Sequence, residues 1–283
     1  MKLKAFAKLN LSLNVGPLEN GFHSLDGIST TVNLFDQIEL EKRSDSQVVV
    51  IDNVYGEENV ALKVARAFVE KFSTCGVNIK IKKGIFEKAG MGGSSADASA
   101  VLVGMCQLFQ KDKADVLDVA TKFGSDVAYL MCGGLAKISG KGDDVTPLEF
   151  CPLHFVVVAF FEGLSTKEVY QTFDKVGSDV FCDNDKLESC LTSGQINIAQ
   201  KLVCNGLSKS AWTVASQKLK DQWQKLDEFC ATQNLPPFTL TGSGSAKFVF
   251  AKDQNEAKDI AEKLSNAGFC AVALSSTPCG VAT

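Results

Sequence analysis

A run of glycine and serine that leads into a helical pattern is the part of this sequence best suited to chemistry. Residues 89–95 read Ala-Gly-Met-Gly-Gly-Ser-Ser. After them, apolar residues recur with helical spacing, at Ala98, Leu102, Met105, Cys106 and Phe109. Glycine lets a backbone approach a ligand closely, and a helix N-terminus presents free N–H groups and about half a positive charge. The segment therefore predicts a phosphate-binding loop, with a plain linker before a helix as the alternative.

Two single side chains and a second glycine turn are further candidates for a site. Lys8 stands on the polar side of a segment that alternates over residues 8–15, and Asp126 follows a Gly-Ser pair just ahead of an apolar stretch. Taken alone, Lys8 has the plain explanation of a solvated lysine and Asp126 that of a helix N-cap. The functional explanation for Asp126 is a carboxylate that accepts the proton of a substrate hydroxyl during phosphoryl transfer. The turn Gly242-Ser243-Gly244 precedes a strand pattern and by itself predicts only a hairpin turn.

The composition describes a globular protein with no basic field. The chain has 283 residues, of which 45% are hydrophobic and 22% charged, enough for one large domain or two ordinary ones. Its formal net charge of −4 argues against nucleic acid as a partner. An anionic ligand must therefore be held by local donors.

The cysteines do not indicate a metal site. There are ten of them, none in a C-x-x-C pair, and only two histidines. Reduced, buried thiols in a cytoplasmic protein explain them better than a disulfide framework. The N-terminus shows a strand pattern instead of a signal peptide, and no apolar run is long enough to span a membrane. The cytoplasm is the expected location.

The elements that would position these residues mix helices and strands without regular βαβ alternation. Strands are predicted over 8–15, 47–51, 77–82, 155–161, 247–251 and 269–274. Helices are predicted after Asn59 as N-cap, after the glycine loop, ahead of Gly124, over 210–233 as one long helix, and from Asp253 with a capping box to Gly268. Residues 175–185 read as a loop. The mixture favours an α+β fold with antiparallel sheets.

Together these features resemble the GHMP kinase superfamily, and within it the family of 4-diphosphocytidyl-2-C-methyl-D-erythritol kinases. Residues 7–13 fit A-K-[IL]-N-L-x-L, and 20–23 fit D-G-[YF]-H with Asn20 in place of Asp. The phosphate-loop motif matches 89–99 with Ser94 in place of a glycine. The other family motifs lie at 124–128 (with Ala128 for proline), 140–148, 165–170 and, with one inserted residue, 184–188. The similarity covers nearly the whole chain and is weakest over about 190–235.

The resemblance implies a two-domain fold with a cleft between an ATP-binding domain over 1–150 and a C-terminal domain over 151–283. It also implies ATP-dependent phosphorylation of the 2-hydroxyl of a CDP-linked methylerythritol, a step of the non-mevalonate isoprenoid pathway. Mg²⁺ should accompany ATP; its protein ligand is unknown, with the Ser95 hydroxyl as one candidate. The partners expected are small molecules, without nucleic acid or membrane, and a homodimer stays open. The alternatives are a homoserine or mevalonate type of GHMP kinase, or a catalytically silent ligand-binding protein.

The resemblance also assigns roles to individual residues. Asp126 would orient the substrate hydroxyl and accept its proton, and Lys8 would keep that carboxylate ionised. The ATP phosphates would lie against Ala89, Gly90, Met91, Gly92, Gly93, Ser94 and Ser95. The substrate would contact Asn10, Phe22, His23, Thr166, Tyr170, Gly242 and Ser243, with Phe22 and Tyr170 on the two faces of cytosine and core packing as the alternative for Phe22. Ser94 would crowd the phosphates if its position required a positive φ.

Overall fold

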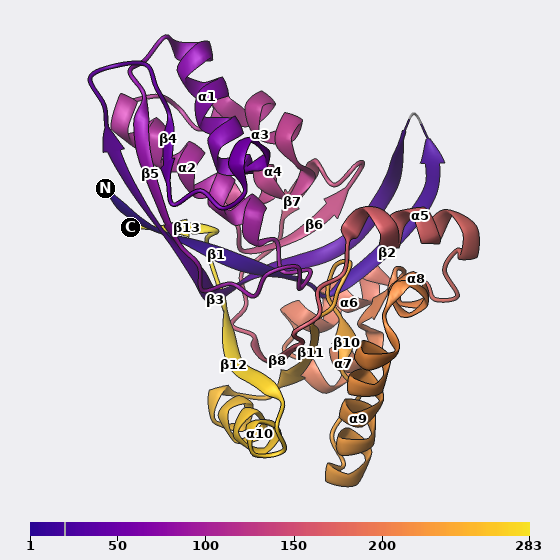
Figure 1. Ribbon diagram of the computed structural model, residues 1–283. Helices are drawn as coiled ribbons and strands as arrows, with labels where there is room; N and C mark the ends of the chain where they lie inside the picture. The colour runs from indigo at the N-terminus through magenta and orange to yellow at the C-terminus, as the bar shows by residue number, and fades with distance from the viewer. Residues whose placement is uncertain (20) are drawn as a thin grey trace.

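The computed structural model describes residues 1–19 and 21–283, with the two termini side by side at one edge (Figure 1). Its strands are β1 (Lys2–Asn10), β2 (Ser12–Glu19), β3 (Phe22–Lys42), β4 (Val49–Ile51), β5 (Val77–Lys82), β6 (Leu135–Ser139), β7 (Asp144–Pro147), β8 (His154–Ala159), β9 (Cys204–Asn205), β10 (Thr239–Leu240), β11 (Lys247–Ala251), β12 (Cys270–Thr277) and β13 (Val281–Ala282). Its helices are α1 (Val60–Phe72), α2 (Gly93–Phe109), α3 (Leu117–Phe123), α4 (Ser125–Cys132), α5 (Thr166–Val176), α6 (Asn184–Thr192), α7 (Ile196–Leu202), α8 (Ser208–Val214), α9 (Gln217–Gln233) and α10 (Gln254–Asn266).

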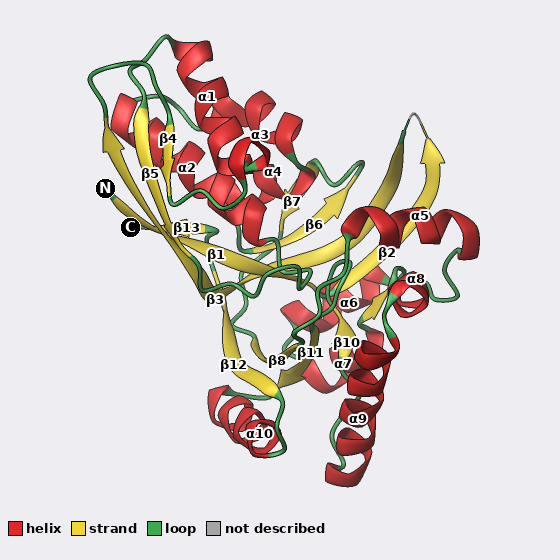
Figure 2. Cartoon of the chain, viewed as in Figure 1, coloured by secondary structure: helices red, strands yellow, loops and turns green. Residues whose placement is uncertain are grey.

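One long strand organises the sheet. β3 runs for 21 residues and pairs antiparallel with β1, β2, β5, β6 and β12. Parallel pairing is confined to the short ladders β2–β9 and β4–β5 among the described strands. Helices α1–α4 cover one face of the sheet around β1, β3 and β5, while α10 packs on β8 and β12 at the other end (Figure 2). The α+β fold with mainly antiparallel pairing is confirmed.

The apolar core is continuous between the two ends of the sheet. A large cluster joins β1, β3, α1, α2 and α4, and it also takes in residues of β8 and β11. Two smaller clusters lie between β8, β11, α9 and α10 and around α5, α8 and α9. Because β12 pairs with β3, the sheet continues from one half to the other. The domain boundary at residue 150 therefore stays a prediction. Across residues 1–19 and 21–283, no helix is both long enough and apolar enough to cross a membrane.

Several local predictions are confirmed by cap geometry. Asn59 is the N-cap of α1, and its side chain accepts a hydrogen bond from the N–H of Ala61 at 3.0 Å. Asp253 caps α10 by accepting from the N–H of Glu256 at 2.9 Å. The return bond of this capping box goes to the N–H of Lys252, one residue before the cap. Gly124 ends α3 as predicted.

The single helix predicted over 210–233 is wrong. The chain leaves α8 at Ala215, and Ser216 caps a new helix by accepting from the N–H of Leu219 at 3.2 Å. The break lets Trp212 of α8 stack on Trp223 of α9, with ring centroids 6.0 Å apart. The capping serine and the stacked indoles therefore outweigh the helical periodicity that continues through the break.

Three further predictions need correction. The strand at 155–161 ends at Ala159, and Phe161 is 95% exposed. The single strand over 8–15 is divided at Leu11 between β1 and β2, and its polar side is buried instead of solvated. The expectation of reduced thiols fails for one pair, because Cys182 and Cys204 form a disulfide that joins the segment before α6 to β9.

Candidate active site

A cavity of about 730 Å³ brings together most of the residues that the sequence singled out. Its lining comes from β1, from the segment 83–95, and from the segments 163–170 and 242–243. Asp126, at the start of α4, also faces it. Lined by a glycine loop and by charged side chains of both signs, among them Lys8 and Asp126, a cavity of this size suits a nucleotide with its acceptor.

Lys8 and Asp126 form the chemical centre of this cavity. The Lys8 side chain is almost fully buried, and its Nζ lies 3.5 Å from Oδ2 of Asp126, which is 40% exposed. Both plain alternatives are therefore wrong: Lys8 is not solvated, and Gly124, not Asp126, holds the N-cap position of α4. Asp126 lies in the first turn, where a helix favours a carboxylate. A carboxylate open to the cavity is placed to accept a proton from a bound hydroxyl.

The side chain of Asn10 holds the ammonium group of Lys8 in place. Lys8 Nζ donates to Asn10 Oδ1, the amide of Asn10 donates to Ser29 Oγ at 3.0 Å, and the backbone N–H of Asn10 donates to Thr241 Oγ1 at 3.0 Å. All four side chains are buried. The ammonium therefore has a defined position before any ligand arrives.

The glycine loop has the conformation that its composition predicts. Lys88, Gly90 and Gly92 have φ of 50°, 76° and 74°, and Gly92 is the left-handed N-cap of α2. A Cβ on Gly92 would lie 3.1 Å from Cγ of Lys8, so glycine is required by both backbone and neighbour. Ser94 is in the first turn of α2 and has no positive φ, so the crowding considered for this position does not arise from its backbone.

The turn Gly242–Gly244 packs closely against the glycine loop. A Cβ on Gly90 would lie 2.1 Å from the carbonyl oxygen of Thr241, and one on Gly242 would lie 2.6 Å from the carbonyl oxygen of Gly90. Ser243 Oγ also lies 2.8 Å from Thr166 Oγ1, which ties the turn to the start of α5. The turn is thus part of the cavity wall and not an ordinary hairpin turn.

The residues predicted to bind cytosine are only partly brought together. Tyr170 lines the cavity, and burial raises its pKa. His23 packs beside it with ring centroids 5.4 Å apart, while its ring nitrogens lie 2.9 Å from the carbonyl oxygen of Gly16 and 3.2 Å from Asp174 Oδ1. The imidazole therefore packs against the ring of Tyr170 and helps to hold it in place.

Phe22 is the first residue of β3, in the hairpin that β3 forms with β2. It is 55% exposed, and Lys141 Nζ lies 4.6 Å from its ring centroid. Core packing is thus excluded for Phe22, but the described residues that line the cavity do not include it. Its role in stacking stays a prediction. Asn20 of the same motif lies outside the described residues.

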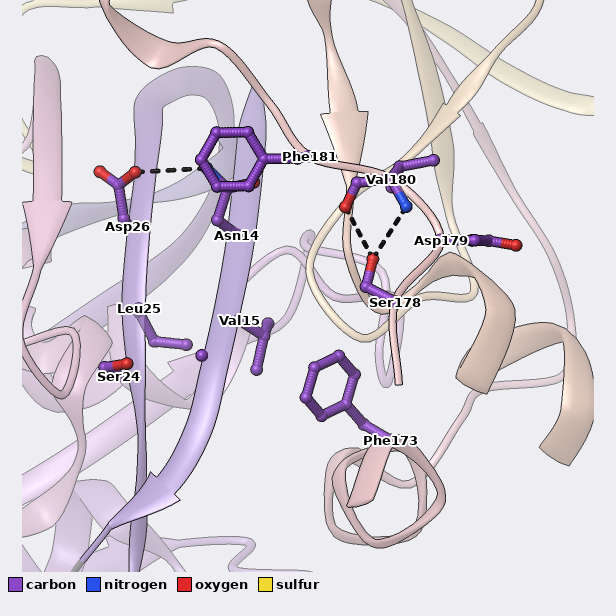
Figure 3. Close-up of a pocket in the computed structure, with 11 residues that line it drawn as sticks. Asn14, Val15, Ser24, Leu25, Asp26, Phe173, Ser178, Asp179, Val180 and Phe181 are labelled. Atoms are coloured by element: carbon purple, nitrogen blue, oxygen red, sulfur yellow. Dashed lines mark hydrogen bonds between the residues drawn. The ribbon is translucent and has the colours of Figure 1, made fainter. Parts of the chain in front are cut away.

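A second cavity lies on the same hairpin and away from the lysine–carboxylate pair. It measures about 710 Å³ and is enclosed by β2, β3, the end of α5 and the loop 178–181 (Figure 3). Asn14 donates to Asp26 at 3.2 Å in its wall, and Phe173 faces into it. It shares Leu25 with the first cavity but holds neither Lys8 nor Asp126.

Sequence reasoning missed the group beside the glycine loop. Lys83 Nζ contacts Asp36 and lies 2.9 Å from Asp97 Oδ2, and Asp36 also accepts the N–H groups of Gly84 and Ile85 at 2.6 and 2.8 Å. Lys83 lines the cavity. The motif at 89–99 includes Asp97, but nothing in the periodicity brings it together with Asp36 on β3 and Lys83 just after β5. Within the described chain, no group of three or more His, Cys, Asp or Glu could hold a metal ion on its own.

Because Asp97 is buried, its contribution to the stability of the folded state depends on pH. Burial, opposed by the charge of Lys83, raises the pKa of Asp97 from 3.8 to about 8, and its Oδ1 has no hydrogen-bond partner in the described part of the chain. A raised carboxyl pKa stabilises the folded state fully below the unfolded value and loses that contribution as the pH rises to the folded value.

We therefore expect Asp97→Asn to melt above the wild type at pH 8, by roughly 2–4 °C for each kcal/mol. The difference should shrink between pH 8 and pH 5, and thermal melting across this range measures it. Asp118→Asn on the surface of α3 is the control, and its melting difference should not grow with pH. A difference for Asp97→Asn that stays constant or grows toward pH 5 would refute the assignment.

Comparison with known proteins decides the family. Residues 59–134 match the family model of the GHMP kinases N terminal domain. A 4-diphosphocytidyl-2-C-methyl-D-erythritol kinase of Clostridium botulinum (strain Eklund 17B / Type B) is 32% identical over 272 residues, which cover 93% of this chain and 95% of the relative. The chain belongs to the 4-diphosphocytidyl-2-C-methyl-D-erythritol kinase family.

Solved structures agree with this placement. A crystal structure of a 4-(cytidine 5'-diphospho)-2C-methyl-D-erythritol kinase has a TM-score of 0.81 and 27% identity, and covers 98% of this chain and 99% of its own. The homoserine kinase of Cytophaga hutchinsonii has a TM-score of 0.74 with 17% identity, over 100% of this chain and 96% of its own, which shows a shared fold alone. Membership of the 4-diphosphocytidyl-2-C-methyl-D-erythritol kinase family confirms the GHMP kinase fold that the motifs implied.

Proposed function

We propose that this protein transfers the γ-phosphoryl group of ATP to the 2-hydroxyl of 4-diphosphocytidyl-2-C-methyl-D-erythritol. The observation that carries the proposal is the position of the Lys8–Asp126 pair in the same cavity as the glycine loop and the N-terminus of α2. This arrangement places a proton acceptor and an anion-binding loop around one space. The name of the family supplies the substrate.

The chemistry follows from the positions of these groups. The substrate hydroxyl is held beside Asp126, which accepts its proton as the oxygen attacks the γ-phosphorus. The bond from that phosphorus to the β–γ bridging oxygen breaks, and ADP leaves. Lys8 stabilises the negative charge that develops on the attacking oxygen. The N–H groups at the start of α2 bind the phosphates of ATP. Positioning and charge stabilisation supply most of the catalysis in reactions of this kind.

Mg²⁺ fits the oxygen-rich part of this cavity. The ion supplies charge neutralisation on the ATP phosphates and prefers oxygen ligands. Ser95, in the first turn of α2, lines the cavity and would offer its hydroxyl oxygen to the ion. Since Mg²⁺ keeps several waters and phosphate ligands, one or two protein ligands are sufficient.

The partners that we propose are small molecules, namely ATP and the CDP-linked acceptor. The cytoplasm is the proposed compartment. A two-domain division near residue 150 would place the ATP loop in the first domain and Thr166, Tyr170 and Gly242 in the second. Homodimer formation remains an open prediction.

An acceptor comparison tests the proposed function. ADP release is measured with the CDP-linked methylerythritol, homoserine and mevalonate at equal concentrations. Turnover should be confined to the CDP compound, and CMP or CDP should compete with it. Comparable turnover of homoserine or mevalonate, together with no competition by CMP, would leave the GHMP fold in place and refute the substrate.

The predicted cytosine contact gives a sharper test. Base–aromatic stacking contributes about 1–3 kcal/mol. Tyr170→Ala and Phe22→Ala should therefore each raise KM for the CDP compound about 5–150-fold, while KM for ATP changes less than threefold. Tyr170→Phe keeps the aromatic face and is the matched control, so its KM should stay near that of the wild type. Equal KM values for Tyr170→Ala and Tyr170→Phe would exclude stacking on this ring.

A further inference from the structure

We propose that Asn205 is a positioning residue for phosphoryl transfer: it holds the turn Thr241–Gly244, which in turn holds Asn10 and Lys8. Asn205 lies in the region where the resemblance to the family is weakest, and it is outside the cavity that holds the reacting groups. The inference rests on the proposed kinase activity and assigns a role to a part of the chain that the sequence motifs leave unexplained.

Both polar atoms of the Asn205 side chain form hydrogen bonds within the protein. It is 1% exposed, on the two-residue strand β9. Its Nδ2 donates to the carbonyl oxygens of Leu240 and Gly242, at 2.9 and 2.8 Å, and its Oδ1 accepts the N–H of Leu207 at 2.9 Å. An amide offers two N–H donors, and here both bind carbonyls on either side of Thr241. This geometry clamps the entrance of the turn.

The clamped turn leads directly to the catalytic pair. Thr241 Oγ1 accepts the backbone N–H of Asn10 at 3.0 Å, and the Asn10 side chain accepts from Lys8. On its other side the turn packs against the ATP loop, since a Cβ on Gly242 would lie 2.6 Å from the carbonyl oxygen of Gly90. Displacement of the turn would therefore shift both the lysine and the loop.

Neither an acid nor an alanine at this position can replace the amide. A carboxylate at position 205 would face two carbonyl oxygens with no N–H to offer, and an alanine would leave both carbonyls without this donor in a buried place. β9 is itself fixed by its pairing with β2 and by the disulfide at Cys204. The loss of the amide should therefore release the turn and leave the strand in place.

The test compares Asn205→Ala and Asn205→Asp with a matched buried amide. Asn184 is 5% exposed, donates to Asp26 at 2.7 Å and accepts from Ser12 at 2.5 Å, and Asp26 lines the second cavity. We expect both Asn205 variants to lose kcat about 10–100-fold, the scale of an ångström-sized misplacement, and to raise KM for ATP as well, because the turn packs against the ATP loop. Asn184→Ala should lower the melting temperature to a similar extent and keep kcat within threefold.

The proposal is overturned if folded Asn205 variants keep kcat within threefold, or if Asn184→Ala loses as much kcat as they do. Amide hydrogen exchange over residues 239–247 gives a second readout that needs no substrate. Exchange there should rise in the Asn205 variants and not in Asn184→Ala, and unchanged exchange would also overturn the proposal. A wild type without turnover would refute the proposed function, and the exchange at the turn would still decide whether Asn205 holds it.

Discussion

Asp126→Asn is expected to lower kcat by about 10²–10⁴-fold, the contribution of a positioned general base, while the Kd for ATP changes less than threefold. The amide keeps the shape of the side chain but cannot accept the hydroxyl proton. Because Asp126 is partly exposed and lies at the first turn of α4, its loss as a charge should disturb folding little. Single-turnover kinetics and ATP titration by calorimetry separate the two effects.

A surface aspartate supplies the control. Asp118 lies in the first turn of α3 and pairs with Lys71 at 2.6 Å, away from the cavity. Asp118→Asn should keep kcat near that of the wild type. If Asp126→Asn also kept it, the carboxylate would serve only the helix N-terminus, and the catalytic assignment would be wrong.

Gly92→Val should raise KM for ATP at least tenfold and lower kcat, because two constraints act at this position. A valine with φ of 74° is strained by about 1–3 kcal/mol, and its Cβ would press on Lys8 Cγ at 3.1 Å. The branched side chain would also cover the N–H groups that bind phosphate. Steady-state kinetics for ATP, on protein shown to be folded by thermal melting, measures the change.

Gly194→Val isolates the contribution of backbone strain. Gly194 has nearly the same φ, 71°, but among the described residues nothing beyond its chain neighbours lies within 4 Å of a Cβ placed there. This variant should lose stability and keep its KM for ATP. Equal KM values for the two glycine variants would move the phosphate site away from Gly92. Gly93 is a weaker test position, since the nearest described atom to a Cβ there lies 3.5 Å away.

Much of the site could be predicted from local sequence patterns. The glycine loop was recognisable because left-handed glycines and a helix N-terminus require that composition, and Gly90 and Gly92 have the expected positive φ. Asn59 and Asp253 were recognisable because caps are local. Lys8 and Asp126 needed the family resemblance, since a lysine on an alternating strand carries no mark of burial in its own neighbourhood.

What could not be predicted depends on contacts between distant segments. β3 gives no simple alternation because its 21 residues meet five different partner strands along their length. The polar side of β1 is buried by Thr241 and other residues that lie far along the chain. Lys83 with Asp36 and Asp97, the Cys182–Cys204 pair and the Asn205 clamp each join segments whose proximity only the tertiary fold creates.

The most direct test of the central claim is phosphorus NMR of the complete reaction with the wild-type protein, ATP, Mg²⁺ and the CDP-linked methylerythritol. If the Lys8–Asp126 cavity phosphorylates the 2-hydroxyl, one new phosphomonoester resonance should grow in step with ADP while the diphosphate of the acceptor stays intact. Hydrolysis of ATP without a new phosphomonoester, or cleavage of the CDP diphosphate, would contradict the account.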